Sequence, residues 1–213
     1  MPSLRRRTTA VLATLAIVAA PAAAEAQAWT YPSFQPPVIV DREYNFGVAS
    51  GDDNGTSLLF QWREGFSPVS QLSLDVGFAD PDFGDGRFLI GGAYARQMIR
   101  ANADVPLDLM LTAGAYGSFG DDVQVFRIPV GVSVGHRFPL EGQLALTPYI
   151  HPRASIDIFT GDMDDTEINV GFDLGVNFEV TRQLSLRFAA VINELEQDGF
   201  GFSVAYRPRG LRR

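Results

Sequence analysis

The sequence predicts an all-β protein, an antiparallel up-and-down transmembrane β-barrel of about ten strands, with eight strands as the alternative. Two observations predict it. From Tyr44 onward, apolar side chains recur at every second position, which is the period of a strand rather than of a helix. The connections between these runs also alternate between an acidic kind and a compact kind, as expected of a barrel with two different ends.

The residues before the first run predict export. Arginines at 5–7 precede an apolar stretch at 10–20 and then small residues, which is the order of a secretory signal peptide. Residues 1–28 are therefore assigned to a signal peptide, with cleavage expected after Ala24, Ala26 or Ala28. The proline-rich residues 29–42 are expected to form an extended periplasmic leader, and 43–207 to form the barrel.

Ten runs show the alternation. They cover residues 43–50, 56–63, 71–78, 87–100, 107–116, 127–137, 144–158, 168–179, 184–190 and 199–206. The first three are clean, as Leu58, Phe60 and Trp62 show for the second run. Alanines and the pair Gly91-Gly92 blur the fourth run, whereas the fifth places leucines opposite polar residues.

The last five runs are mostly longer, and branched or aromatic residues fill one face of each. Pro129 lies in the sixth run, and Pro148 and Pro152 lie in the seventh. Each proline removes a ladder donor, so bulges or shifted strand boundaries are expected there. The tenth run, 199–206, alternates glycine and small residues with phenylalanine, valine and tyrosine.

The connections define the two ends of the barrel. The acidic end consists of residues 51–55, 80–86, 120–122, 161–167 and 193–199, which hold 14 of the 25 Asp and Glu residues. The compact end consists of residues 64–68, 101–106, 139–143 and 181–183. With an even strand number both barrel termini lie at the compact end, which predicts that this end faces the periplasm. Residues 208–213 are then a basic C-terminal tail.

Alternation alone does not say which face of a barrel points outward. A soluble exported lipocalin-like barrel has the same period with the opposite orientation. Two features favour the membrane barrel: one face is almost unbroken Leu, Ile, Val and Phe, and aromatic residues gather near strand ends as a membrane-interface girdle does. The girdle residues are Trp62, Phe78, Phe88, Phe126, Phe138, Phe200 and Tyr206.

The signal sequence, the run at 71–78 and the closing run at 199–206 resemble the small Gram-negative outer-membrane barrels of the OmpA/OmpX type. The resemblance covers residues 43–207 and lies in pattern rather than in a fixed signature. It implies an outer-membrane location and contact with outer-membrane lipid and lipopolysaccharide. Two departures are that Tyr206 is followed by the basic tail, and that no peptidoglycan-binding domain is expected.

The residues that carry chemistry are few. The chain has no cysteine and two histidines, His136 and His151, with His136 expected on the lipid side and His151 in the lumen. No nucleophile elbow or phosphate loop is present, so we predict a non-enzyme with no cofactor and no metal site. The acidic connections 80–86 and 162–165 are expected to bridge divalent cations weakly at most. The net charge of −8 disfavours nucleic-acid binding.

The lumen face is expected to carry charge pairs. Extending the strand register from the turns places an arginine opposite or diagonal to a carboxylate in three cases, within reach of each other. The predicted pairs are Arg127–Asp157, Arg153–Asp173 and Arg187–Glu179. Such pairs predict a plugged lumen and a structural or surface-interaction role. The alternative is a small passive pore for ions or small solutes.

Overall fold

The computed structural model describes residues 33–51, 55–80, 86–121, 123–161, 164–193 and 198–209. The predicted signal peptide lies outside them. The strands are β1 (Arg42–Gly51), β2 (Gly55–Ser67), β3 (Ser70–Asp80), β4 (Arg87–Ile99), β5 (Asp108–Phe119), β6 (Val123–Gly135), β7 (Phe138–Pro139), β8 (Ala145–Gly161), β9 (Asp165–Glu179), β10 (Leu184–Asn193) and β11 (Gly199–Tyr206). No helix in this part of the chain is long and apolar enough to cross a membrane.

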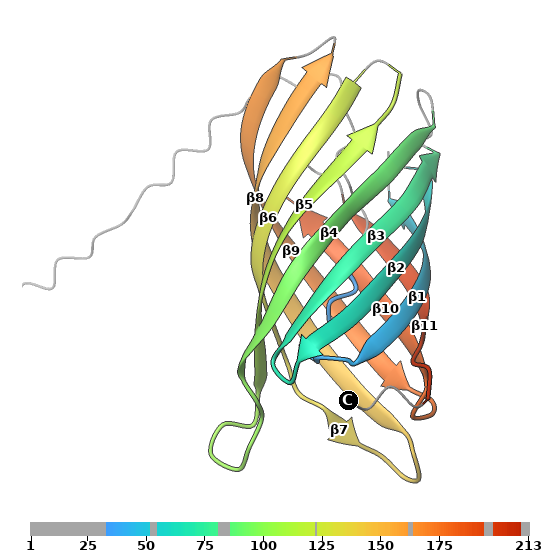
Figure 1. The fold of residues 1–213 in the computed structure, drawn as a ribbon, viewed down its shortest axis with the longest axis vertical. Coiled ribbons are helices and arrows are strands. Elements are labelled where there is room, and N and C mark those ends of the chain that lie inside the picture. Colours follow the sequence, from blue (N-terminus) through green and yellow to red (C-terminus); the bar gives the residue numbers. More distant parts are fainter. Residues whose placement is uncertain are drawn as a thin grey trace, which may run out of the picture.

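The strands form one closed antiparallel barrel (Figure 1). Neighbours in the chain pair with each other from β1 to β6 and again from β8 to β11, and the pairings β6–β8 and β1–β11 close the circle. The two-residue β7 pairs only with β8, below the compact end of the wall in Figure 1. The barrel therefore has ten strands, as the ten runs predicted, and the eight-strand alternative is wrong.

The predicted division into two faces is confirmed. On the outer face, large apolar side chains are exposed along the strands, as Phe46, Leu58 and Leu174 illustrate. On the inner face, the buried side chains are mainly small or polar. Closure explains this difference, because inward-pointing side chains share a narrow lumen whereas outward-pointing ones have only the barrel's surroundings to contact.

All seven predicted girdle aromatics are exposed on the outer face. They are Trp62, Phe78, Phe88, Phe126, Phe138, Phe200 and Tyr206. Phe88 and Phe200 lie at the strand starts next to the acidic end, whereas Tyr206 closes β11 at the compact end. The apolar outer band is therefore edged by aromatic rings at both ends.

The prolines do not produce the bulges expected of them. Pro148 and Pro152 lie inside an unshifted β8–β9 ladder, and Pro129 lies opposite Ser155 of β8. The β6–β8 pairing is interrupted between Gly131 and Val134, next to Pro152, which has no N–H to donate. Long neighbouring ladders thus hold these strands in register despite the missing donors.

Residues 33–41, which we call the inner segment, run from the inside of the barrel to its compact end, where Asp41 is exposed. Phe34, Gln35, Pro36 and Pro37 are buried, and the segment runs within the barrel before β1 begins at Arg42 (Figure 1). These residues belong to the stretch 29–42 expected to be an extended periplasmic leader. For the described part this expectation is wrong, because wall side chains bind its backbone and the lumen covers its aromatic ring.

Candidate functional site

Polar side chains of the lumen wall hold the backbone of the inner segment. Ser133 Oγ donates to the carbonyl of Gln35 at 2.5 Å, and Arg63 donates to the carbonyl of Phe34. The Gln71 side-chain oxygen accepts from the N–H of Val40 at 3.0 Å. These contacts come from β2, β3 and β6, so the segment is tied to several sides of the barrel at once.

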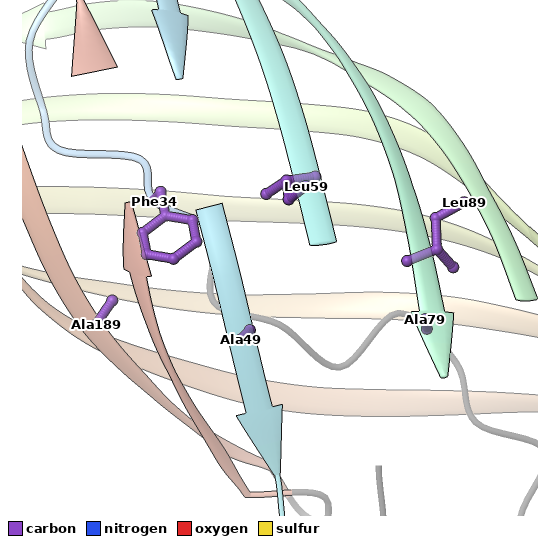
Figure 2. Packing of buried hydrophobic residues seen from close by; sticks show 6 residues of the cluster. All are labelled: Phe34, Ala49, Leu59, Ala79, Leu89 and Ala189. Atoms are coloured by element: carbon purple, nitrogen blue, oxygen red, sulfur yellow. The ribbon is translucent and has the colours of Figure 1, made fainter. Parts of the chain in front are cut away.

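The ring of Phe34 fills a notch in the wall (Figure 2). It is fully buried and clusters with Ala49, Leu59 and Ala189, which come from β1, β2 and β10. A Cβ added at Gly201 would lie 2.7 Å from Phe34 Cζ. One added at Gly47 would lie 3.3 Å from Phe34 Cε2. Glycine at these positions therefore makes the room that the ring occupies.

Phe34 also has a backbone conformation that side chains rarely adopt. Its φ is +47°, in the left-handed region, and no other non-glycine residue of the described chain has a positive φ. This conformation costs a non-glycine residue about 1–3 kcal/mol, which its surroundings must offset. The notch and the Arg63 hydrogen bond are the contacts that hold Phe34 in this conformation.

A bidentate ion pair joins two neighbouring strands on the lumen side of the wall, near the acidic end. Arg127 of β6 lies directly opposite Asp157 of β8 in the ladder. Its Nε donates to Asp157 Oδ1 at 2.7 Å, and its terminal nitrogen donates to Oδ2 at 2.6 Å. Asn169 adds a third donor to the same carboxylate at 3.3 Å. Because the carboxylate is fully buried, these donors replace the water that it would otherwise bind.

A second group of polar residues connects the wall to the inner segment. Asp173 Oδ1 accepts from Arg153 at 3.1 Å, and its Oδ2 accepts from the Ser33 hydroxyl at 2.7 Å. His151 Nδ1 lies 3.2 Å from the same Oδ2 and 2.8 Å from Ser33 Oγ. On the other side of the ring, His151 Nε2 lies 2.9 Å from Thr112 Oγ1. Asp173 is therefore shared among two wall residues and the segment.

The Thr112–His151–Asp173 arrangement has the order hydroxyl, imidazole, carboxylate that nucleophilic catalysis uses. The ring can reach across β6 because Gly131 has no side chain, and a Cβ there would lie 2.6 Å from His151 Nε2. The adjoining cavity, however, has a volume of only about 30 Å³. A cavity of this size holds very few waters and leaves little space for an organic substrate beside Thr112.

At the compact end, one carboxylate forms ion pairs with three arginines. Glu43 of β1 is fully buried, and its Oε1 lies 3.3 Å from Arg63. Its Oε2 lies 2.8 Å from Arg187 and 2.9 Å from Arg207. Arg207 follows β11, so the start and the end of the barrel meet at this carboxylate.

The predicted charge pairs are formed in two cases out of three. Arg127 binds Asp157 directly rather than diagonally, and Arg153 binds Asp173 diagonally rather than directly. The Arg187–Glu179 pair is wrong. Arg187 lies opposite Asn177 as expected, and its Nε donates to Asn177 Oδ1 at 2.9 Å, but its ion pair is with Glu43. Glu179 instead binds Arg137 at 2.7 Å.

Sequence reasoning missed the residues that receive the inner segment. Gln61, Gln71, Gln97 and Ser133 all have lumen parity, but nothing in the pattern shows that their partner is a backbone rather than a side chain. One signal was present: β1, β10 and β11 bring Gly47, Ala49, Ala189 and Gly201 to one side of the lumen. Small residues on adjacent strands leave a space that something else must fill.

A cleft of about 660 Å³ opens at the compact end. Val38, Ile39 and Val40 of the inner segment line it together with Arg182, Arg207 and Arg209. Arg209, in the described part of the basic tail, donates to the Gln183 side-chain oxygen at 2.8 Å. The cleft therefore leads from the compact end to the inner segment.

Within the described residues, no three His, Asp or Glu side chains are grouped so that they could hold a metal ion. The acidic connections 80–86 and 162–165 were considered for divalent cations. Residues 81–85 of the first and 162–163 of the second lie outside the described residues.

No known protein family and no curated protein matches this chain. Solved outer-membrane barrels resemble it in fold, among them the following three. The KdgM porin is 7% identical with a TM-score of 0.42, over 78% of this chain and 99% of that one. LpxR from Salmonella typhimurium is 7% identical with a TM-score of 0.47, over 77% of this chain and 99% of that one. Omp33 of Acinetobacter baumannii is 9% identical with a TM-score of 0.39, over 79% of this chain and 98% of that one. At these identities the likeness concerns the fold alone.

Proposed function

We propose that this chain is an integral outer-membrane β-barrel protein with a closed lumen and a structural or surface-interaction role. The observation that carries the proposal is the filled interior. The inner segment and the ion pairs occupy the lumen, and the cavity beside Ser33 and His151 holds very few waters. A lumen filled in this way would obstruct the continuous water-filled path that a hydrated ion needs.

The outer face supports insertion into a membrane. Its exposed apolar side chains include Phe46, Leu58, Ile128, Val170, Leu174 and Phe188. A soluble lipocalin-like barrel would present mostly polar side chains to water, and contiguous exposed apolar surface of this kind is rare in soluble monomers. A closed barrel also leaves no unpaired ladder edge, which a lipid environment requires.

The same outer face supports outer-membrane lipid and lipopolysaccharide as the proposed partners. The acidic end would reach the lipopolysaccharide phosphates through weakly bound divalent cations, because like charges repel without them. A role outside catalysis is favoured because the cavity next to the Thr112–His151 pair is small.

Two measurements test this proposal. The mature protein should fractionate with the outer membrane and migrate faster on SDS gels before boiling than after, since a closed ladder resists detergent until heated. Folded protein in the soluble periplasmic fraction would contradict the membrane assignment. In planar bilayers the purified wild type should show no steady single-channel conductance, and a conducting wild type would favour the passive pore.

A further inference from the structure

The wall of the lumen is built to receive a peptide. The residues that bind the inner segment offer amide, hydroxyl and guanidinium groups to its backbone, and all are buried. Beyond Arg63, Gln71 and Ser133, Gln61 donates to the carbonyl of Ser33 at 3.5 Å and Gln97 to that of Pro37 at 3.4 Å. Contacts to backbone atoms bind an extended peptide whatever its side chains are.

Specificity is concentrated at one position. The notch at Gly47 and Gly201 accepts the flat ring of Phe34, and added Cβ atoms would intrude on that ring. A backbone-binding groove with one aromatic pocket is a common way to recognise a peptide. The inner segment also adds the hydroxyl of Ser33, which donates to Asp173.

The geometry also gives the segment a way out. It is joined to the wall only at its C-terminal side, where Asp41 precedes β1 and its carbonyl accepts from Gly65 at 2.9 Å. The cleft at the compact end reaches Val38, Ile39 and Val40. The described contacts of residues 33–40 with the wall are hydrogen bonds and packing, with no covalent link.

We infer that the lumen is a binding site for an extended peptide with one aromatic side chain, that residues 33–41 are its resident ligand, and that this ligand exchanges with the same peptide supplied from the compact end. The inference rests on the proposed closed lumen in one respect, namely that departure of the segment opens the barrel. Binding itself does not depend on that proposal.

The test uses the full mature chain in detergent and a fluorescent synthetic peptide with the sequence of residues 33–41. Wild type should bind little of it, because the site is occupied. Phe34→Ala should weaken the resident ligand and so expose the site to the added peptide. A peptide with alanine in place of phenylalanine should bind about a hundredfold more weakly, the effect expected for deleting a buried ring.

Matched variants locate the site. Adding Gly47→Ala and Gly201→Ala to Phe34→Ala should abolish peptide binding, because both methyl groups intrude on the ring. Adding Gly171→Ala should leave binding intact, since a Cβ there has only ordinary contacts, the nearest at 3.5 Å from Arg153. Should Phe34→Ala fail to fold, Phe34→Leu keeps an apolar side chain, and added peptide should compete with it at higher concentration. Heat-shifted gel migration checks the folding of every variant.

Equal binding of the two peptides, or binding that survives the notch substitutions, would overturn the inference. Conductance separates it from the closed lumen. A conducting wild type that still exposes a phenylalanine-selective site in Phe34→Ala removes the closed lumen and leaves the peptide site. A wild type without conductance whose variants bind neither peptide removes the peptide site and leaves the closed lumen. Conductance that appears in Phe34→Ala and is blocked by the peptide supports both.

Discussion

The guanidinium of Arg127 and the carboxylate of Asp157 lie face to face in two parallel hydrogen bonds of 2.7 and 2.6 Å. Their strands pair these two residues directly, so the two side chains leave the wall at the same level of the ladder. Both groups are almost wholly buried. Removing either one alone leaves the other without its main partner.

We therefore expect Asp157→Ala or Arg127→Ala to lower the free energy of unfolding by about 3–5 kcal/mol each. The double variant should lose less than the sum, because it leaves no unpaired charge. Denaturant unfolding of the refolded protein measures all three. The half-buried pair Arg42–Glu64 at the compact end serves as control, with at most about 1 kcal/mol of coupling. Additive losses at Arg127 and Asp157 would mean that water solvates both groups.

Glu43→Gln should be among the most damaging conservative substitutions in the barrel. It removes the carboxylate that forms ion pairs with Arg63, Arg187 and Arg207, and leaves three guanidiniums close together. A loss of about 3–5 kcal/mol in unfolding free energy is expected. Glu64→Gln, which makes the same chemical change at a half-buried pair, should cost about 1 kcal/mol or less. Similar losses for both would contradict the buried cluster.

Arginine substitutions on the outer face of β9 should depend on depth. Leu174→Arg, near the middle of the strand, should impair insertion by about 2–4 kcal/mol, whereas Ile168→Arg near the acidic end should cost about 0–1 kcal/mol. Both native residues are exposed apolar side chains, so the comparison isolates position. Folding yield into vesicles, scored by heat-shifted migration, measures the difference. Equal yields would argue against a bilayer around this face.

Gly131→Ala should destabilise the barrel although it adds only one methyl group. The added carbon would lie 2.6 Å from His151 Nε2, 2.9 Å from the carbonyl of Pro152 and 3.0 Å from Arg153 Cβ. The imidazole must then move away from Thr112, and we expect a loss of about 1–3 kcal/mol. Thermal unfolding compares this variant with Gly171→Ala, which should be close to wild type. No difference between the two would mean that the ring moves freely.

The alternation of apolar and polar residues made the barrel predictable. The register, that is, which residues of neighbouring strands lie opposite each other, did not follow fully from the sequence. Strand count and face assignment depend only on alternation, which the sequence displays. Pairing Arg153 with Asp173 required assuming a symmetric loop at the acidic end, and His151 in fact lies opposite Asp173. A shift of two residues keeps the face and changes the partner, so the charges stayed in the lumen while their geometry changed.

The inner segment could not be predicted for a different reason. Its sequence, with Pro36 and Pro37, has neither the period of a strand nor that of a helix, so local pattern gives no sign of a partner. Its contacts lie on strands that are distant in sequence, as Ser133 with Gln35 shows. The three arginines around Glu43 are equally non-local, because they meet only once the barrel has closed.

The position of Phe34 bears on how the barrel stays shut. The first and last strands meet at the β1–β11 pair, the one seam in the wall that no hairpin turn connects. Phe34 packs against Gly47 and Ala49 on one side of that seam and against Gly201 on the other. The ring thus packs against both strands of this pair. A barrel without the ring should lose its β1–β11 pairing before its other strand pairings. We expect its main effect on the unfolding rate rather than on the final shape.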